Sequence, residues 1–417
     1  MNTNSKLVPK RRFKEFINAN AWEQRKLIEM LIQPITDGPH ETPELVDEGI
    51  PFISVDAIVD NRIEFSRRRG FITEKYHEQC CKKYNPQFND VYLVKSGSTV
   101  GKTAIVETYD RFNIWSPLAA MRCGDRSDPY FLYHMIQTKQ LQTQVFDKCS
   151  HGTQPNLSMR QLEKFDVNVP NIEEQNKIGQ YFTYLDNLIT LYQRKLEKLK
   201  SMKAAYLTEM FPQEGESVPK RRFAGFTDAW EQRKVSEITK FHKQGYYTKE
   251  DYGDNKKYFL LRGTDLSENK LVLKDTPRID ATEKDYAVFK TEIGDFLIVR
   301  SGTVGTYGIV DVEFPAIFGS YLINFRFDME QVTNEFFGYF YQTNLFKTQL
   351  SKIVQQSANT NINAENIKSI AISLPPLVEQ KKIAEYLGNL DNLITLHQRK
   401  LEKLQNIKKA YLNEVFV

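Results

Sequence analysis

The sequence lacks the marks of a secreted, membrane-spanning or disulfide-stabilised protein. Its four cysteines form no C-x-x-C pair, so we expect reduced thiols rather than a metal or disulfide framework. No apolar run approaches the roughly 20 residues that a membrane-spanning helix needs. The opening MNTNSKLVPKRRF has no apolar core of the kind found in signal peptides. We therefore expect a cytoplasmic protein that does not enter a membrane.

Signatures of catalysis are also missing. The six histidines are scattered, without an H-E-x-x-H motif or zinc spacing. Segment Gly97–Thr103, GSTVGKT, has three residues between its glycines, whereas a phosphate-binding P-loop needs four. NPQF (85–88) and DPY (128–130) depart from the N/D-P-P-Y/F pattern of amino-methyltransferases. We expect no catalytic residue, no metal and no cofactor in this chain.

Neither sign of charge dominates. The chain carries 57 basic and 53 acidic residues, a net charge of +4, which permits nucleic-acid binding without requiring it. A length of 417 residues predicts roughly two to three domains, and 41% hydrophobic residues are enough for ordinary cores.

A long internal repeat is the main positive feature. Segment 171–211 returns 205 positions later as segment 376–416, with LDNLITL and QRKLEKL unchanged. VPKRRF and AWEQRK also occur twice each, so the order is leader, block, helix, and then the same again. The boundaries that we expect are leader 1–26, block 27–170, helix 171–212, linker and second leader 213–234, block 235–375, and helix 376–417.

The two blocks mix strand-like and helix-like runs, which favours an α+β fold. Val91–Val94 and Phe296–Val299 are typical of strands, and Tyr130–Val145 and Asn334–Ile353 are typical of helices. The strand–turn–strand stretches DVYLVKSGSTVGKTAIV and DFLIVRSGTVGTYGIV match, but the front halves of the blocks barely do. The repeated VPKRRF leaders more plausibly dock onto the scaffold than read a sequence.

Hydrophobic residues recur along both long segments at alternating steps of four and three, the spacing of a coiled-coil seam. They are Ile178, Phe182, Leu185, Ile189, Tyr192, Leu196 and Leu199, then Ile383, Leu387, Leu390, Ile394, His397, Leu401 and Leu404. A second stripe predicts a partner-docking face: Leu188, Leu191, Leu393 and Leu396. Antiparallel helices of this length would span roughly 55–60 Å. They form either a spacer between the blocks or an ordinary dimerisation device.

The E-Q-x-K-I openings (174–178 and 379–383), the L-D-x-x-I cores and the S-G-x-x-G turns resemble the specificity (S) subunit of type I restriction–modification systems. The resemblance covers essentially the whole chain. It implies two target-recognition domains separated by two long antiparallel helices about a pseudo-twofold axis. It also implies binding to double-stranded DNA, two methyltransferase (M) subunits and restriction (R) motor-nuclease subunits. S-adenosylmethionine, ATP and magnesium would belong to those partners.

Candidate DNA-binding residues lie in three kinds of loop. The glycine-rich turns are either plain hairpins or loops facing phosphates, and the Asn and Gln loops either contact adenine or form turns. The turn and hairpin candidates are His40, Lys95, Ser96, Thr99, Lys102, Gln244, Tyr246, Arg300, Ser301, Thr303 and Thr306. The polar-loop candidates are Gln154, Asn156, Asn359 and Asn361. Arg67, Arg68 and Arg69 either contact phosphates or form a solvated face.

The helices are nearly identical while the blocks diverge, so the two blocks are expected to read different half-sites. The target would then be bipartite and non-palindromic, with a gap set by the helices. Two alternatives stay open. One is a two-headed DNA-binding regulator that acts alone, and the other is a nucleotide-dependent enzyme that uses GSTVGKT, which loss of ATP binding in Lys102→Ala would support.

Overall fold

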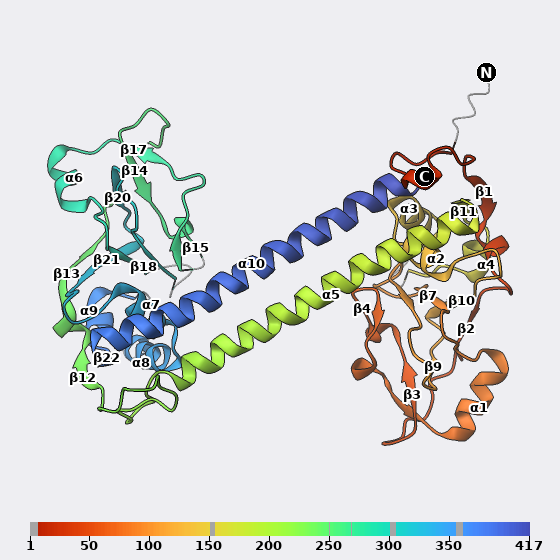
Figure 1. The fold of residues 1–417 in the computed structure, drawn as a ribbon, viewed down its shortest axis with the longest axis horizontal. Coiled ribbons are helices and arrows are strands. Elements are labelled where there is room, and N and C mark those ends of the chain that lie inside the picture. The colour runs from red at the N-terminus through yellow and green to blue at the C-terminus, as the bar shows by residue number, and fades with distance from the viewer. Residues whose placement is uncertain (1–6, 151–154, 250, 268, 301–305, 356–361) are drawn as a thin grey trace. The chain divides into compact units, whose positions relative to one another are not determined.

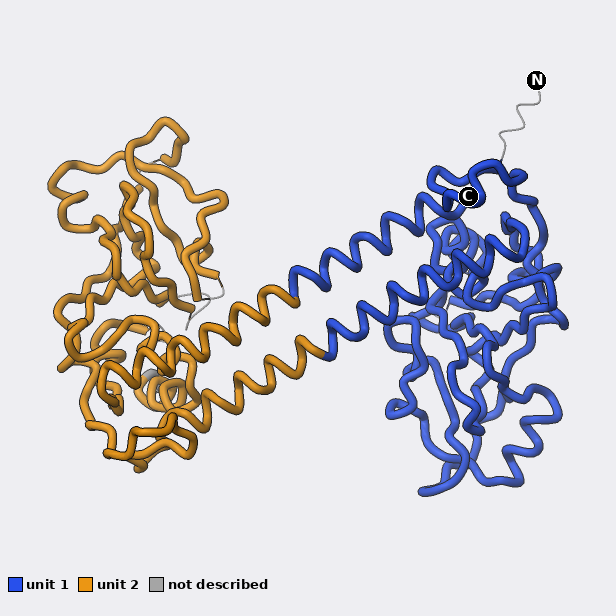
Figure 2. Tube along the Cα trace, in the orientation of Figure 1, with its two compact units in different colours: residues 1–194, 398–417 blue, residues 195–397 orange. Residues whose placement is uncertain are grey.

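The structure is a computed structural model that describes residues 7–150, 155–249, 251–267, 269–300, 306–355 and 362–417. It divides into two compact units (Figure 2). Unit 1 comprises residues 1–194 and 398–417, and unit 2 comprises residues 195–397. The boundaries between the units fall inside the two long helices, so each unit contains part of both.

The first repeat combines short strands with helices (Figure 1). Its elements are β1 (Glu23–Lys26), β2 (Thr36–Asp37), β3 (Ile50–Ile53), β4 (Ile58–Val59), β5 (Arg62–Ile63), β6 (Gly70–Ile72), α1 (Glu74–Lys83), β7 (Val91–Val94), β8 (Thr103–Ile105), β9 (Asn113–Ile114), β10 (Leu118–Met121), α2 (Pro129–Ile136), α3 (Lys139–Lys148), α4 (Met159–Leu162), β11 (Asp166–Val169) and α5 (Ile172–Glu209). The strands pair as an antiparallel sheet β2-β10-β7-β8, a sheet β6-β3-β9, and the pairs β1-β11 and β4-β5.

The second repeat contains the same elements in the same order. They are β12 (Glu231–Lys234), β13 (Thr239–Gln244), β14 (Tyr258–Leu261), β15 (Leu266–Ser267), β16 (Lys270–Leu271), β17 (Arg278–Ile279), α6 (Glu283–Phe289), β18 (Phe296–Val299), β19 (Tyr307–Ile309), β20 (Ala316–Phe318), β21 (Leu322–Phe327), α7 (Asn334–Gln342), α8 (Asn344–Gln355), α9 (Ala364–Lys368), β22 (Ala371–Leu374) and α10 (Leu377–Val415). The sheets are β13-β21-β18-β19 and β17-β14-β20, with the pairs β12-β22 and β15-β16. The α+β prediction is confirmed.

The predicted strands at 91–94 and 296–299 are confirmed as the central strands β7 and β18. All four residues of each are buried. In β7, Val91 and Leu93 pack into the core that contains α2 and α3, whereas Tyr92 and Val94 pack against β3 and β9. Because both faces are covered, the strand is apolar throughout instead of alternating.

Two features of the blocks go beyond what the sequence showed. Their front halves barely match in sequence, yet they contain equivalent elements. Each long helix-like run is also two helices rather than one. Thr138 ends the first half of its run and caps α3, because its Oγ1 accepts from the backbone N–H of Leu141. Thr343 does the same for the N–H of Phe346 in α8.

Helices α5 and α10 pack antiparallel, as expected, and the seam residues are buried or half-buried. In unit 1, the ring of Tyr181 stacks on that of Tyr411. In unit 2 the equivalent of this pair is Tyr386 of α10 with Tyr206 of α5, and their rings meet edge-on. Each unit therefore contains the same helix contact with the two helices in exchanged roles.

A polar network beside the seam is repeated in the same way. In unit 1, Lys408 Nζ lies 2.7 Å from Asp186 Oδ1 and donates to the side chain of Gln137. In unit 2, Lys203 Nζ lies 2.6 Å from Asp391 Oδ1, and it donates to Gln342. Such reciprocal contacts are the property expected of a pseudo-twofold repeat.

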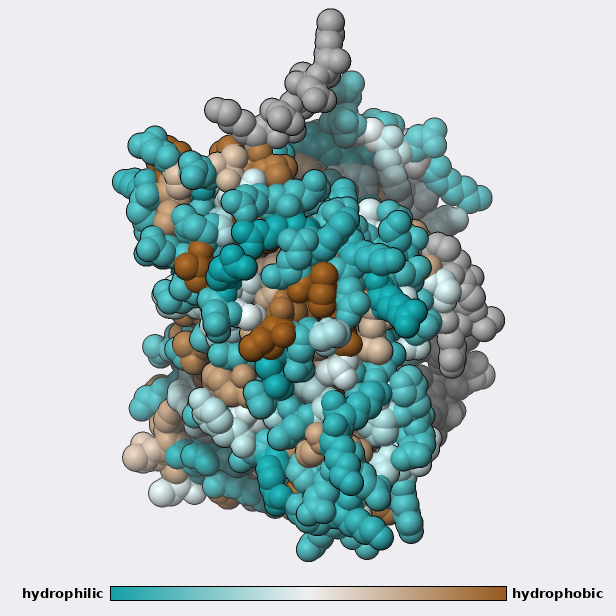
Figure 3. Space-filling view, turned by 90° about the vertical axis from the view of Figure 1, so that its right-hand side faces the viewer, coloured by the Kyte–Doolittle hydropathy of each residue, from teal (hydrophilic) through white to brown (hydrophobic). Residues whose placement is uncertain are grey.

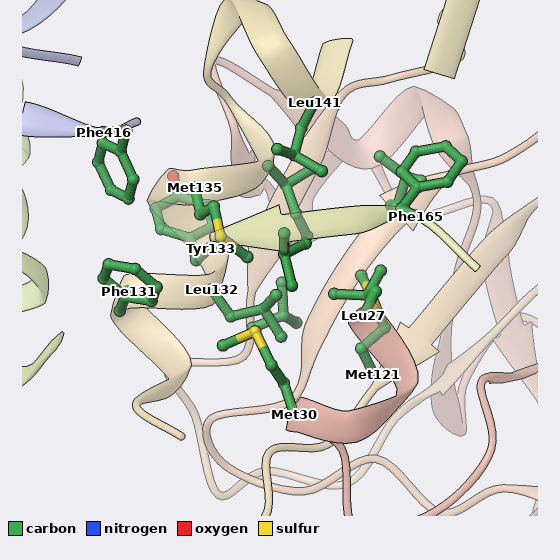
Figure 4. Close-up of a cluster of buried hydrophobic side chains, with 14 of the residues drawn as sticks. Leu27, Met30, Met121, Phe131, Leu132, Tyr133, Met135, Leu141, Phe165 and Phe416 are labelled. Atoms are coloured by element: carbon green, nitrogen blue, oxygen red, sulfur yellow. The ribbon is translucent and has the colours of Figure 1, made fainter. Parts of the chain in front are cut away.

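The core of each unit includes the end of a helix from the other repeat. Figure 4 shows Phe416, which follows α10, beside Phe131 of α2 in the core of unit 1. Trp22 of the first leader meets Phe416 edge-on, with ring centroids 6.2 Å apart. In unit 2, Trp230 packs in the same way on Phe211, which follows α5.

The leaders dock onto the helices, as predicted. The guanidinium of Arg12 makes two hydrogen bonds, of 2.7 and 2.6 Å, with the buried carboxylate of Glu174 at the start of α5. Arg222 makes the same pair with Glu379 at the start of α10. These contacts explain why the glutamate of the E-Q-x-K-I opening recurs.

The described helices include none that is long and apolar enough to cross a membrane. The four cysteines form no disulfide. The face shown in Figure 3 is mostly hydrophilic, with small apolar groups separated by hydrophilic residues.

Candidate nucleic-acid interface

The β7–β8 hairpin of unit 1 brings several predicted residues together. Glycines at its turn have positive φ, 95° at Gly97 and 96° at Gly101, as the hairpin interpretation requires. The hairpin pairs with the segment after residue 154, because Ser96 forms an isolated β-bridge with Asn156. Lys95 leads into this turn. The structure therefore places Lys95, Ser96 and Asn156 side by side.

A buried aspartate extends this group to a corner that the sequence pattern did not identify. Asp37, at the end of β2, has a fully buried side chain. Its Oδ2 lies 3.2 Å from Lys95 Nζ and 3.3 Å from His40 Nε2, and its Oδ1 accepts from Lys83 Nζ. We call Asp37, His40, Lys83 and Lys95 the charged corner. Asp37 was visible in the turn TDGPH, but Lys83 comes from α1, 46 residues away.

The arginine run lies near this corner and is exposed. The guanidinium of Arg69 stacks over the ring of Trp115 at 4.1 Å, and that of Arg68 stacks over Phe71 at 4.1 Å. The residue after Trp115 donates its backbone N–H to the carbonyl of Pro39, which ties this stack to the His40 loop. No such stack is found for Arg67 among the described contacts.

The remaining hairpin residues of unit 1 differ in accessibility. Lys102 is exposed on the β8 side of the turn, where it could meet a phosphate. Thr99 is half-buried, and its Oγ1 is buried without a hydrogen-bond partner among the described residues. Thr99 therefore fits a structural role in the turn better than a base contact.

In unit 2, strand register shows which residues occupy the equivalent places. Asp37 pairs with Ala119 of β10, and Gln244 pairs with Ile323 of β21. Ala119 and Ile323 correspond because the residues before them pair with the last residues of β7 and β18. Gln244 therefore stands in the place of Asp37.

Glycine follows at both places, and neither position has room for a Cβ. At Gly38 a Cβ would overlap the carbonyl of Ile114, and at Gly245 it would overlap that of Gly319. Tyr246 and Tyr247 then stand where unit 1 has Pro39 and His40. Equivalent turns thus carry different side chains.

Unit 2 has an aromatic corner at this place. Arg300 occupies the place of Lys95, because its N–H donates to the carbonyl of Tyr321 as that of Lys95 donates to Pro117. Beside it is a hollow of about 600 Å³. Its lining includes Tyr246, Tyr247, Tyr252, Arg262 and Tyr321. Gln244 is exposed and Thr306 half-buried. The predicted residues Gln154, Ser301, Thr303, Asn359 and Asn361 lie outside the described residues.

One ion pair is the same in both units. Asp90, just before β7, accepts two hydrogen bonds of 2.7 Å from the guanidinium of Arg122. Asp295, just before β18, accepts from Arg326 at 2.5 and 3.2 Å. In each case the hydrogen bond to the buried carboxylate raises the pKa of the arginine. This pair belongs to the shared scaffold.

The predicted docking stripe is mostly exposed. Leu191, Leu393 and Leu396 are exposed on α5 and α10, whereas Leu188 is half-buried against the core of unit 1. Their role in docking stays a prediction. Glu379 of the E-x-K sequence is buried in its pair with Arg222, so it is not an available acid or base. Among the described residues, no group of three or more His, Cys, Asp or Glu could hold a metal.

The duplicated α+β domain and the long antiparallel helices define a class of two-headed recognition scaffold. The family model described as "Type I restriction modification DNA specificity domain" matches residues 22–201 and again residues 227–406. The chain therefore belongs to the family of type I restriction–modification specificity subunits, which are DNA-recognition subunits. This confirms the resemblance noted in the sequence.

Individual relatives are similar along most of their length. The type I restriction enzyme MjaVIII specificity subunit of Methanocaldococcus jannaschii is 23% identical over 385 residues, which cover 88% of this chain and 86% of that protein. The putative MjaX specificity subunit of the same organism is 25% identical over 408 residues, 94% and 92% of the two chains. A crystal structure of the type I S subunit from M. genitalium shares the fold, with a TM-score of 0.65 at 14% identity over 98% of this chain and 99% of that one.

Proposed function

We propose that each unit reads one half of a bipartite, asymmetric DNA sequence and that the helices hold partner enzymes at that site. The partners are two methyltransferase subunits, which modify an adenine in each half-site, and motor-nuclease subunits. This chain supplies no catalytic group, and S-adenosylmethionine, ATP and magnesium are bound by the partners. We place this complex in the cytoplasm.

The observation that carries this proposal is where the two units agree and where they differ. Leader pairs, helix contacts and the Asp–Arg pair recur in both. Asp37 and Lys95, in contrast, are replaced by Gln244 and Arg300 at equivalent places. Two heads that read the same half-site would keep the same side chains at their tips. Different tips on one scaffold therefore favour two different half-sites.

The chemistry of the corners suits DNA. Exposed cations such as Lys102 and Arg67 would contact phosphates, which fix the register of a protein on the duplex. Side chains at the two corners would then meet base edges in the major groove. Because unit 1 offers ammonium groups and unit 2 offers tyrosines and an arginine, the two half-sites should differ in base composition.

The helices supply two equivalent docking faces. Leu191 and Leu396 are the same position in the two repeats, and both are exposed. Exposed leucines at repeated positions would let one kind of methyltransferase surface bind twice. The length of the paired helices, 38 and 39 residues, would then set the gap between the half-sites.

Exchange of a recognition block tests the separate heads. Block 27–170 is replaced by that of another family member, and the methylome of a host that carries the chain with its methyltransferase partner is sequenced. We expect one half-site to change while the other half-site stays. The matched exchange of block 235–375 should change only the other half. A change of both halves in either exchange contradicts separate reading, and specific DNA binding by the chain alone, with no methyltransferase partner, favours a stand-alone regulator.

Insertion of one helical turn near Lys200 in α5 tests the spacer. We expect the modified motif to keep both half-sites and to change its gap, because only the length of the helix between the units is altered. A matched substitution of exposed residues around Lys200, without insertion, should leave the gap as it is. An unchanged gap in the methylome of the insertion variant excludes the helices as the measuring element.

A further inference from the structure

The charged corner of unit 1 is built around a carboxylate that solvent cannot reach. The side chain of Asp37 is 0% exposed, while Lys95 is 11%, Lys83 is 45% and His40 is 71% exposed. Three basic side chains from three different elements thus converge on one buried acid. Lys95 neutralises it from inside, and Lys83 and His40 form the outer surface. Desolvation of an acid is costly unless such partners surround it.

The fold itself does not need this corner. Unit 2 has the same strands and the same glycine after β13, but it has Gln244 in the place of Asp37, and among its described residues no lysine equivalent to Lys83 contacts this glutamine. The helix that supplies Lys83 has 10 residues, and its counterpart α6 has 7. The scaffold pair Asp90–Arg122, by comparison, is kept as Asp295–Arg326. The charged corner is therefore specific to what unit 1 does.

The corner presents hydrogen-bond donors and hides its acceptors. Lys83 Nζ donates to Asp37 and, at 2.9 Å, to the carbonyl of Gly38. An ammonium has three donors, so one remains for a ligand. Both carboxylate oxygens of Asp37 face the basic groups. A base edge that meets this surface must offer acceptors, and guanine offers two neighbouring ones, N7 and O6, in the major groove.

We propose that the charged corner reads a guanine in the half-site of unit 1, with Lys83 donating to its N7, His40 flanking it and Asp37 acting as a positioning residue. The inference rests on the proposed function and adds the base class and the residues. Two contacts from Lys83 to Asp37 and Gly38 hold the ammonium in one place. A flexible lysine without them would serve a phosphate equally well, whereas a fixed donor can discriminate between bases.

The test measures coupling between Lys83 and guanine N7 in the complete complex with its methyltransferase partner. The half-site of unit 1 is first identified by the exchange of block 27–170. Each guanine in it is then replaced in turn by 7-deazaguanine, which lacks the N7 acceptor. We expect the wild-type complex to bind roughly tenfold more weakly at one position. The Lys83→Gln variant should bind both DNAs alike at that position.

Controls separate base reading from general charge and from folding. Lys82→Gln removes one positive charge from the neighbouring exposed position of α1 and should keep the 7-deazaguanine effect. Asp37→Asn should relax the motif at the same base in the methylome. Asp37→Asn leaves the nearly buried Lys95 without its acid. Lys83→Gln keeps Asp37 in place and is therefore the milder of the two variants.

Four results would overturn the inference: a unit 1 half-site without guanine, no loss of wild-type binding with 7-deazaguanine at any position, equal loss by Lys82→Gln and Lys83→Gln on all DNAs, which marks a phosphate contact, or an unchanged motif in Lys83→Gln. The proposed function fails separately, because the wild-type complex would then yield no bipartite motif at all.

Discussion

Unit 1 and unit 2 share the ion pairs that stabilise the fold, and they differ in the side chains at their exposed corners. Arg12 and Arg222 hold their glutamates in the same way, and Asp90 and Asp295 hold their arginines in the same way. At the corner that ends β2, however, a buried acid with three basic neighbours is replaced in unit 2 by a glutamine and tyrosines. Comparison of the two copies therefore shows which contacts the fold needs, because those contacts occur in both.

Loss of the shared acid should have the largest effect. Asp90→Ala should lower the free energy of unfolding by about 3–5 kcal/mol, because it leaves the guanidinium of Arg122 without its buried partner. Asp295→Ala should cost a similar amount. Urea unfolding of the full chain measures both, with the exposed Asp125→Ala as control. A large loss at only one of the two positions would show that the scaffolds are not equivalent.

A difference inside the scaffold should appear as a pH effect. His134 of α2 is fully buried, and desolvation, reinforced by Lys408, lowers its pKa well below the usual value of about 6.5. The unfolded chain therefore binds a proton near pH 6.5 that the folded chain does not bind. Stability should fall as pH drops below about 6.5, by up to roughly 1.4 kcal/mol per pH unit. Above that range the contribution is constant.

The equivalent residue of unit 2 is Tyr339, which donates to Asp391 and stays neutral in this range. The unfolding free energies of the wild type and of His134→Gln are measured between pH 5 and 8. The difference between their slopes against pH is the contribution of His134 alone. The variant should show the flatter curve at low pH. Parallel curves would mean that the ring is protonated within the folded unit.

The smallest effect should come from the reciprocal helix pairs. Reversal of one charge, Lys203→Asp, should cost about 1 kcal/mol, and the double variant with Asp391→Lys should recover most of it. The same cycle at Lys408 and Asp186 should give a similar coupling. Melting of the four variants in each set measures it, and unequal couplings would break the reciprocity of the two helix contacts.

The sequence predicted what is local or repeated. The 4–3 spacing predicted the helices, and the recurrence of the leaders predicted their docking, which the Arg12–Glu174 pair confirms. It did not predict the likeness of the front halves, because TDGPH and KQGYY share only the glycine. That glycine is shared because a Cβ at either place would strike backbone. The other side chains at this turn face the corner, and they are free to differ.

Two features could not be predicted from the hydrophobic pattern, one in the candidate site and one in the fold. Lys83 meets Asp37 only through folding, so no local pattern could assign it. Thr138 looked like an interior helix residue, since the apolar periodicity continues past it. Its hydroxyl instead caps a new helix. Hydrophobic periodicity does not reveal such a hydrogen bond between a side chain and the backbone.

The docking of Phe416 against Trp22 has a consequence for how the protein is made. The backbone and side-chain contacts of Arg11 with Glu414 join residues 403 positions apart. The first unit to leave the ribosome is therefore the last to be closed. At 5–20 residues per second, synthesis of the residues between Arg194 and Phe416 keeps its core open for roughly 10–45 s. Unit 2, whose closing residue Phe211 precedes Trp230, has all its parts before synthesis ends. A chain that stops short of its last helical turn should thus hold one finished head and one that still exposes the indole of Trp22.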